Sequence, residues 1–357
     1  MANGDAERMK NSGRKTREMN TAILGTGSYL PREVLTSAEL GDRLGVGEQW
    51  IIDRTRIRER RVAAPDEATS DLATQAANQA IQDAGLTAAD IDLIIVATST
   101  PDQPMPASAC LVQANLGAWR AAAFDVEAVC SGFVYALVIA HAMLVADAGP
   151  HTALVIGADT YSRVLDYTDR KTAVLFGDGA GAVVLGKVPH GRGLMASLLG
   201  ADGAAADYVQ VPAGGSRRPA SHETVRHGEH YFAMKGREVR KMAEQVLPEV
   251  VVRLTESAGI DLRDVGLIVP HQANGVILEA MAASLELPED LMHLTVDKYG
   301  NTGAASVPVT LDDAARSGRL TPDSTILLVA FGGGMTWAGA ALQWHGSARY
   351  RKDPEWT

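Results

Sequence analysis

The stretch FDVEAVCSGF, residues 124–133, joins two kinds of secondary structure and places a thiol at the junction. The alternating run AAFDVEAV (122–129) is typical of a strand, and SGFVYALVIAHAMLVADAG (131–149) is typical of a helix. Free N–H groups and the dipole at a helix N-terminus favour an anion, so they lower the pKa of a thiol there. We therefore interpret Cys130 as a candidate nucleophile, although an isolated cysteine is more commonly a small buried hydrophobe.

Strand-like and helix-like runs alternate on both sides of this junction, which predicts an α/β fold with covered sheets. The first half contains predicted helices at 68–85 and 106–118, strands at 21–31, 91–100 and 151–160, and a strand, glycine-rich turn and second strand at 173–187. The second half repeats this order with a helix at 234–259, a strand at 264–274, a helix from 275 and a strand region at 324–344.

The repeated order predicts two similar halves, at 21–190 and 191–345, that form a duplicated α/β/α/β/α sandwich. Chance similarity between α/β segments is the alternative. Residues 1–20 are polar, mix both charge signs and lack the apolar core of a signal peptide, so we expect a disordered extension. Residues 346–357 are expected to form a loose tail.

Composition limits the possible functions. The chain has 357 residues and a net charge of −10, which argues against general nucleic-acid binding. Its two cysteines form neither a disulfide framework nor a zinc motif, which indicates a reducing, cytoplasmic setting, and we interpret Cys110 as structural because its predicted helix is apolar. No apolar run approaches the roughly 18 residues that a membrane span needs.

Three further motifs follow predicted strands, where α/β sheets gather reactive groups. VPHQAN (269–274) supplies His271, YGNTGAAS (299–306) supplies Asn301, and FGGGMTWAG (331–339) supplies backbone N–H groups not covered by side chains. Taken singly, each has a structural interpretation: a surface histidine, a turn asparagine and a flexible glycine turn. Together with Cys130 they predict a nucleophile with hydrogen-bonding partners and an oxyanion site.

These motifs, together with LFGDGAGAVVL (175–185) and WIIDRTRIRERR (50–61), resemble β-ketoacyl-ACP synthase III of the thiolase superfamily. The resemblance runs in order from about residue 21 to residue 344. It implies a five-layered α/β/α/β/α fold, a homodimer, and a catalytic triad of Cys130, His271 and Asn301.

The resemblance also implies a reaction. Cys130 takes an acyl group from acyl-CoA, and the N–H groups of Cys130 and Gly333 hold the oxyanion. His271 and Asn301 then stabilise the enolate that forms when malonyl-ACP loses carbon dioxide, and the enolate attacks the acyl-cysteine. Neither a metal nor a cofactor is expected, and coenzyme A enters only as a thioester substrate.

Further positions match the substrate sites of the family. Trp50 and Arg170 match residues that sandwich the adenine of coenzyme A, and Arg54 contacts the same end. Gly236 and Asn274 match positions along the pantetheine arm. Phe176 and Met105 match positions that line the acyl pocket. Met105 would cross the dimer interface, so that each pocket is completed by the partner subunit. Without the resemblance, these residues have ordinary packing or ion-pair interpretations.

The chain departs from the family pattern in several places. The segment 275–290, where basic residues usually dock the carrier protein, has neither lysine nor arginine, so we assign carrier docking to Arg240 and Lys241. Glu127 stands where a small residue is usual, either pointing away from the site or placing a carboxylate beside the substrate. Gly303 replaces a usual serine, and Lys171 replaces a smaller residue.

These departures keep other functions open. One alternative is a specialised relative that transfers the acyl group to oxygen, nitrogen or another β-ketoacyl thioester. Another is a non-catalytic subunit that binds acyl thioesters. The intact Asn301 favours decarboxylation over the first alternative, and the intact Cys130 argues against the second.

Overall fold

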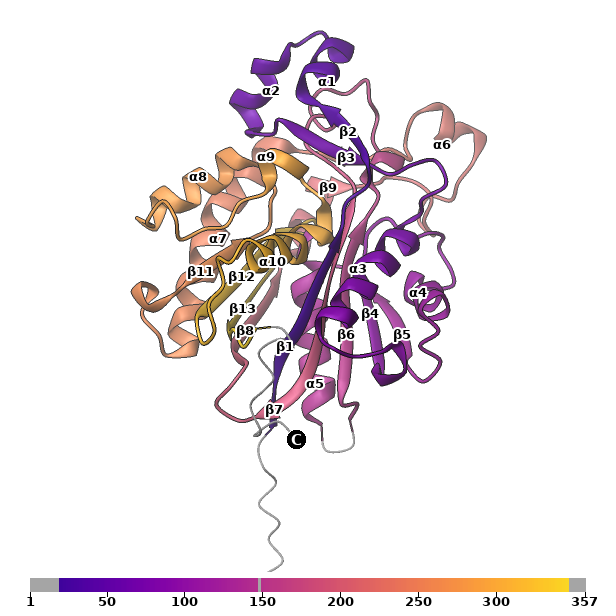
Figure 1. Cartoon of the computed structure of the whole chain (residues 1–357). Helices are drawn as coiled ribbons and strands as arrows, with labels where there is room; N and C mark the ends of the chain where they lie inside the picture. The colour runs from indigo at the N-terminus through magenta and orange to yellow at the C-terminus, as the bar shows by residue number, and fades with distance from the viewer. Residues whose placement is uncertain (1–18, 147–148, 347–357) are drawn as a thin grey trace, which may run out of the picture.

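The structure is a computed structural model that describes residues 19–146 and 149–346, and it consists of two β-sheets separated and covered by helices (Figure 1). The predicted N-terminal extension and C-terminal tail therefore lie almost wholly outside the described residues. Met19 and Asn20, which we had placed in that extension, instead begin the first strand.

The first sheet is mixed and has five strands. Its spatial order is β1 (Met19–Tyr29), β7 (Gly179–Pro189), β6 (Thr152–Asp159), β4 (Leu93–Ala97) and β5 (Ala122–Val126). Strand β7 is antiparallel to both of its neighbours, whereas β4 is parallel to β6 and to β5. Strand β5 therefore forms one edge of this sheet.

The second sheet repeats this arrangement. Its order is β8 (Leu194–Ala201), β13 (Thr336–Gln343), β12 (Thr325–Gly332) and β11 (Leu267–Pro270), with the same sequence of antiparallel and parallel pairings. An isolated parallel bridge between Ile268 and Met292 stands where β5 stands in the first sheet. The matching order in the two halves confirms the predicted duplication.

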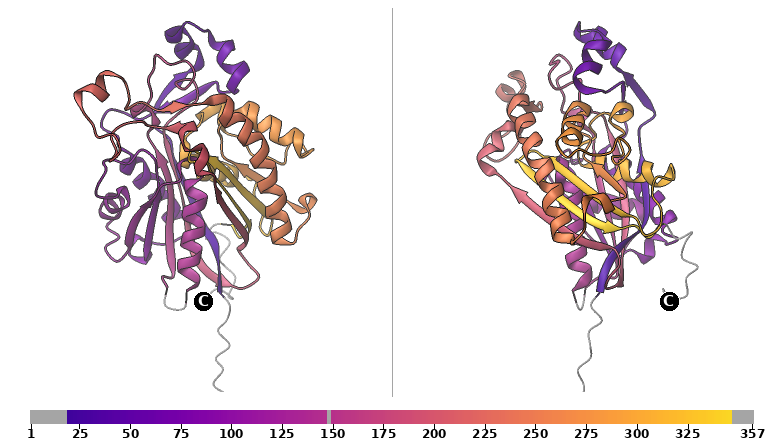
Figure 2. Two further views of the ribbon diagram at one scale, coloured as in Figure 1. Left: turned by 180° about the vertical axis from the view of Figure 1, so that it is seen from behind. Right: turned by 90° about the vertical axis from the view of Figure 1, so that its left-hand side faces the viewer.

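Helices form the other three layers, which Figures 1 and 2 show from three sides. Helices α5 (Gly132–Val145) and α10 (Ser306–Arg316) lie between the sheets and share one apolar core with strands of both. The outer layers are α3 (Thr69–Asp83) with α4 (Ser108–Leu116) on the first sheet, and α7 (Gly236–Ala258) with α8 (Gly275–Ser284) on the second. The five-layered α/β/α/β/α architecture is therefore confirmed.

The central position of α5 explains its composition. Its sequence, GFVYALVIAHAMLV, has no acidic residue, lysine or arginine because sheets cover it on two sides. Helix α4 is different, since it covers only one sheet face. Cys110, which we interpreted as structural because its helix is apolar, lies on the other side of α4 and is exposed in this chain.

The segment 173–187 also differs from its prediction. Only β7 is a strand there, and residues 173–178 form turns that lead into it. Its glycines permit close packing rather than a turn: a Cβ atom on Gly181 would lie 2.6 Å from the backbone nitrogen of Val309 in α10. The glycine-rich run therefore marks the contact between β7 and the central helix layer.

Short elements form a cap over one end of both sheets (Figure 1). They are β2 (Glu33–Thr36), α1 (Ser37–Leu44), α2 (Glu48–Thr55), β3 (Glu59–Val62), β9 (Val209–Gln210), α6 (His222–Arg226), β10 (Ala233–Met234) and α9 (Val296–Tyr299). Among the helices of the described ranges, none has both the length and the apolar character that a membrane crossing requires.

Candidate active site

The carboxyl ends of the parallel strands in both sheets meet beneath this cap, which is where α/β folds place their ligands. A cavity of about 370 Å³ lies there. Of the residues predicted for the site, all but Met105 and Lys241 line it, as follows: Trp50, Arg54, Cys130, Arg170, Phe176, Gly236, Arg240, His271, Asn274, Asn301 and Gly333.

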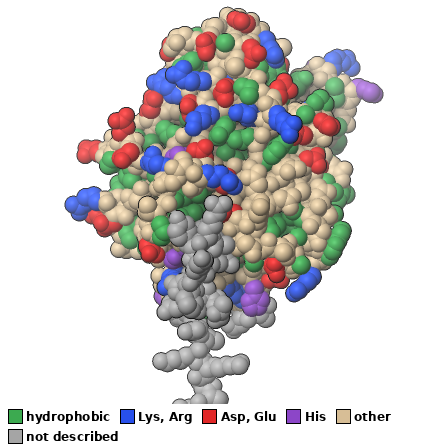
Figure 3. Space-filling view, viewed as in Figure 1, with side chains coloured by type: hydrophobic (Ala, Val, Ile, Leu, Met, Phe, Trp, Pro, Cys, Tyr) green, Lys and Arg blue, Asp and Glu red, His purple; other side chains and the backbone are tan. Residues whose placement is uncertain are grey.

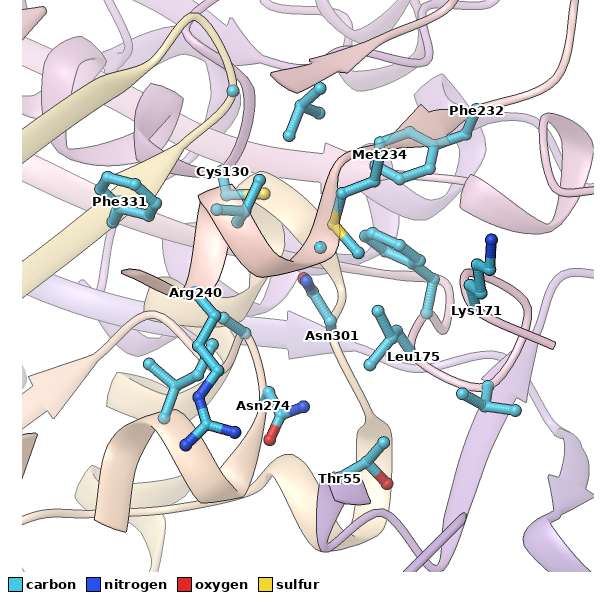
Figure 4. A pocket seen from close by; sticks show the side chains of 18 of the residues that line it. Thr55, Cys130, Lys171, Leu175, Phe232, Met234, Arg240, Asn274, Asn301 and Phe331 are labelled. Carbon is cyan, nitrogen blue, oxygen red and sulfur yellow. The ribbon is translucent and has the colours of Figure 1, made fainter. Parts of the chain in front are cut away.

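Cys130 lies in a single turn of 3-10 helix, Val129–Ser131, directly before α5, and its sulfur points into the cavity (Figure 4). The residue before it, Val129, has a φ of 47°, a left-handed conformation that is strained for a β-branched side chain. The backbone of β12 also lies close to this turn, because a Cβ on Gly332 would be 2.7 Å from the Cys130 nitrogen. The tight turn aims the sulfur away from the strand and into the cavity.

The resting thiol is not activated as we predicted. Cys130 is only 7% exposed, and burial raises the pKa of its thiol to about 12, with a further rise from the buried carboxylate of Asp159. A hydrogen bond from the Tyr161 hydroxyl acts in the opposite direction and lowers this pKa. Burial therefore raises the thiol pKa despite the helix terminus, and the expected lowered pKa was wrong.

His271 is held as a neutral imidazole at the end of β11. Burial lowers its pKa to about 3, and its Nδ1 atom lies 2.5 Å from Ser306 Oγ. Ser306 Oγ also accepts a hydrogen bond from the backbone N–H of Gln272 at 3.4 Å, so its own hydroxyl proton is available for Nδ1. This arrangement favours the tautomer with a proton on Nε2, which makes His271 a neutral donor.

Asn301 is fixed through its backbone and its side-chain oxygen. Its N–H donates to Leu175 O at 2.9 Å, its carbonyl accepts from the Gly177 N–H at 3.0 Å, and Oδ1 accepts from the Gly303 N–H at 2.9 Å. The side chain extends toward Cys130 in Figure 4. Because Oδ1 is engaged, Nδ2 is the group that remains to donate to a substrate.

The mouth of the cavity carries an indole with two guanidinium groups. The Arg54 guanidinium lies 4.4 Å from the centre of the Trp50 ring, and that of Arg170 lies 5.8 Å away. Asn274 is already partnered, since Oδ1 caps α8 at Val276 N (2.8 Å) and Nδ2 donates to Arg54 O (3.0 Å). Its side chain therefore joins α8 to α2 beside the entrance.

The two predicted acyl-pocket residues differ in position. Phe176 is buried and lines the cavity, with its ring stacked 4.4 Å from that of Tyr161. Met105 is 80% exposed and lies outside the cavity of its own chain.

The predicted docking residues are also separated. Arg240 lines the cavity and pairs with Glu244 at 2.7 Å, whereas Lys241 is exposed on α7 and does not line it. Of the departures from the family pattern, Lys171 lines the cavity, but Glu127 is exposed and does not.

Sequence reasoning missed several residues around the triad. Ser306 escaped notice because a serine inside a helix usually has no special role. Phe232 and Met234 line the cavity from an irregular segment and the two-residue strand β10 that follows it, which are too short to show a periodic pattern. Tyr161 and Asp159 stand at the end of β6, beside the end of the parallel strand β4, and this position was the signal available in the sequence.

Fold and site together define the class of protein. A thiolase-like sandwich that brings a cysteine from one half against a histidine and an asparagine from the other is an acyl-transferring condensing enzyme.

Comparison with known proteins agrees with this class. Residues 124–203 match the family model for 3-oxoacyl-[acyl-carrier-protein] synthase III, and residues 255–344 match its C-terminal model. A β-ketoacyl-[acyl-carrier-protein] synthase III from Caldanaerobacter subterraneus subsp. tengcongensis is 50% identical over 90% of this chain and 97% of its own. An acetoacetyl CoA synthase from Streptomyces sp. (strain CL190) is 49% identical over 90% of this chain and 98% of its own.

Among solved structures, the priming β-ketosynthase of the R1128 polyketide biosynthetic pathway is 33% identical with a TM-score of 0.84, covering 94% of this chain and 99% of its own. The chain belongs to the β-ketoacyl-ACP synthase III family.

Proposed function

We propose that this condensing enzyme takes an acyl group from acyl-CoA onto Cys130 and joins it to malonyl-ACP, which starts a fatty acid or a polyketide. The observation that supports this most directly is the single cavity that runs from the Trp50–Arg170 mouth to the Cys130 sulfur. Its entrance suits an adenine and phosphates, and its inner end holds a thiol with two neutral donors.

In the first step the Cys130 sulfur attacks the thioester carbonyl. The backbone N–H groups of Cys130 and Gly333 stabilise the tetrahedral oxyanion, and the carbon–sulfur bond to coenzyme A then breaks. The thiol proton leaves with coenzyme A as its free thiol, so the products are acyl-Cys130 and CoA-SH. Because burial raises the pKa of the resting thiol, we infer that loss of its proton accompanies attack on the thioester.

In the second step a malonyl thioester occupies the emptied channel. His271 Nε2 and Asn301 Nδ2 donate to its thioester carbonyl, where negative charge develops as carbon dioxide leaves. The resulting enolate attacks acyl-Cys130, the carbon–sulfur bond breaks, and the released thiolate takes up one proton. The products are a β-ketoacyl thioester, carbon dioxide and free Cys130. We propose that no metal or cofactor takes part.

A second candidate differs in the carrier of the malonyl group. Helix α8, beside the entrance, has no lysine or arginine, and Glu279 on it pairs with Arg56 at 2.7 Å. On the face shown in Figure 3, basic and acidic side chains are interspersed over the upper half. These features and the similarity to an acetoacetyl CoA synthase favour malonyl-CoA as the second substrate in place of the acidic carrier protein.

The two candidates are separated by a double substitution on α7. If Arg240 and Lys241 dock the carrier, the double variant Arg240→Glu/Lys241→Glu raises the Michaelis constant for malonyl-ACP and leaves that for malonyl-CoA nearly unchanged. Equal effects on both would argue against carrier docking, because Arg240 also lines the cavity.

We also propose a homodimer. Strand β5 is an unpaired edge next to the exposed Cys110 of α4, and the exposed Met105 lies in the loop after β4. A second copy that pairs along this edge brings Met105 to the acyl pocket of its partner. The two free thiols support a cytoplasmic location.

The proposed function is tested by mass spectrometry after incubation with a panel of acyl-CoAs. We expect one acyl adduct on Cys130, its absence in Cys130→Ala, and its retention in Asn301→Ala. Release of carbon dioxide from the malonyl thioester should fall about 100-fold or more in Asn301→Ala, because a donor to the developing charge is lost. The absence of any adduct across the panel would favour a thioester-binding subunit instead.

A further inference from the structure

Tyr161 is a buried polar residue to which the proposed function gives no role. It follows β6 in a short 3-10 turn (Tyr161–Arg163) and is 2% exposed. Its ring stacks on Phe176 at 4.4 Å with 23° between the planes and meets Phe232 edge-on at 5.7 Å. Phe176 and Phe232 both line the cavity, so Tyr161 forms the layer directly behind its acyl end.

The hydroxyl of Tyr161 is placed against the nucleophile. Its oxygen lies 3.0 Å from Ser99 Oγ, and the interaction between this hydroxyl and the Cys130 thiol raises the pKa of Tyr161 and lowers that of Cys130. Burial raises the pKa of Tyr161 well above 10, so this hydroxyl keeps its proton and remains a donor. The other titratable groups around the sulfur are the Asp159 carboxylate and, across the cavity, the His271 imidazole.

Gly303 provides the space for this ring. A Cβ atom there would lie 2.4 Å from Tyr161 Cε2 and 2.2 Å from Asp159 Oδ2, and the φ of 59° also disfavours a side chain. The family pattern has serine at this place. Glycine at position 303 therefore leaves the space that the Tyr161 ring occupies.

We propose that Tyr161 and Gly303 act as a pair that positions the Cys130 sulfur and restricts the acyl group to a short chain. The hydroxyl of Tyr161 donates to the sulfur, and its ring blocks the space that a longer chain would enter behind Phe176. The restriction on chain length rests on the proposed function, whereas the contact between the hydroxyl and the sulfur does not.

The contact is tested by alkylation of Cys130 with iodoacetamide as a function of pH, in a Cys110→Ala background because Cys110 is exposed. Tyr161→Phe keeps the ring and removes the hydroxyl donor. We therefore expect the profile of Cys130 alkylation rate against pH to shift to higher pH by roughly one unit. Tyr135→Phe is the matched control, since it removes a hydroxyl that donates to Gly200 O at 2.8 Å without touching the sulfur. A profile for Tyr161→Phe that matches this control overturns the positioning role.

The restriction on chain length is tested by loading acetyl-, butyryl-, hexanoyl- and octanoyl-CoA. Tyr161→Leu should raise the ratio of octanoyl to acetyl loading about tenfold or more, whereas Tyr161→Phe should keep the short-chain preference. An unchanged ratio in a folded Tyr161→Leu variant overturns this role. Failure of acyl loading in the parent protein would instead refute the proposed function, and it would leave the alkylation result standing.

The pairing is tested by a double-mutant cycle. Gly303→Ser alone should lower the melting temperature and the acetyl loading rate, because the serine competes with the Tyr161 ring. In the Tyr161→Leu background, Gly303→Ser should lower the melting temperature and the acetyl loading rate by less. The loss that remains comes from the contact with Asp159 and from the positive φ at residue 303. Strictly additive effects would show that the two positions are independent and would overturn the pair.

Discussion

At the scale of single residues, the active thiol is governed by two opposing effects. The start of α5 favours an anion at Cys130, whereas burial beside the Asp159 carboxylate disfavours it. Burial dominates: it raises the Cys130 pKa to about 12 and lowers the His271 pKa to about 3, which favours the neutral form of both groups.

This balance predicts how Cys130 reactivity depends on pH. A thiol becomes nucleophilic only as it loses its proton, and its pKa is raised to about 12. Iodoacetamide alkylation in the Cys110→Ala background should therefore increase steadily from pH 7 to pH 10 without a plateau. Cys130→Ala provides the blank, and a plateau below pH 8 would mean that the helix terminus outweighs burial.

At the scale of secondary-structure elements, the site depends on the close approach of β12 to the start of α5. A Cβ atom on Gly332 would lie 2.7 Å from the Cys130 nitrogen and 2.9 Å from that of Ser131. Both contacts are with backbone, which cannot move aside as a flexible side chain can. Glycine at 332 therefore allows β12 to lie against the turn that carries Cys130.

The corresponding prediction concerns Gly332→Ala. The added methyl should push α5 away from β12, lower stability by about 1–3 kcal/mol and reduce acyl loading more than tenfold. Thermal denaturation and loading kinetics measure the two effects. Gly203→Ala is the control, because a Cβ there meets nothing within 4 Å, and equal behaviour of the two variants would contradict the packing argument.

At the scale of the whole molecule, one of the two predicted acyl-pocket residues lies outside the cavity of its own chain. Met105 is 80% exposed and outside its own cavity, near the free edge strand β5. Burying a large apolar side chain contributes about 1.5–3 kcal/mol, which is a reason for such a surface to pair with a second copy. The proposed dimer gives Met105 a function in the partner's site.

Complementation between subunits tests this arrangement. Met105→Asp and Cys130→Ala should each be inactive as homodimers, since each lacks one part of every site. Mixed dimers should recover up to about half of the activity of the parent dimer, because the Cys130→Ala subunit supplies Met105 to the one site with an intact Cys130. Activity assays on co-expressed, differently tagged chains give the measurement, and normal activity of the Met105→Asp homodimer would contradict the proposal.

Most of the fold and the central residues could be predicted because they follow from local sequence. Alternating runs identify buried strands, and residues placed just after parallel strands gather at one end of a sheet. Cys130, His271 and Asn301 all obey this rule. Phe232 does not, because it comes from an irregular segment whose path depends on contacts with the rest of the chain.

The amino-acid sequence by itself determined the duplicated five-layered sandwich, the family and many of the residues that line the cavity. The strands and helices follow from periodicity, whereas the family and the substrate-site residues follow from a resemblance carried by ordered motifs, and both are available without coordinates. Only the tertiary structure decided that the thiol rests neutral, that Arg240 faces the cavity and that Tyr161 occupies the space left by Gly303. Burial, charge proximity and steric fit depend on distances between segments far apart in the chain, and no local pattern encodes them.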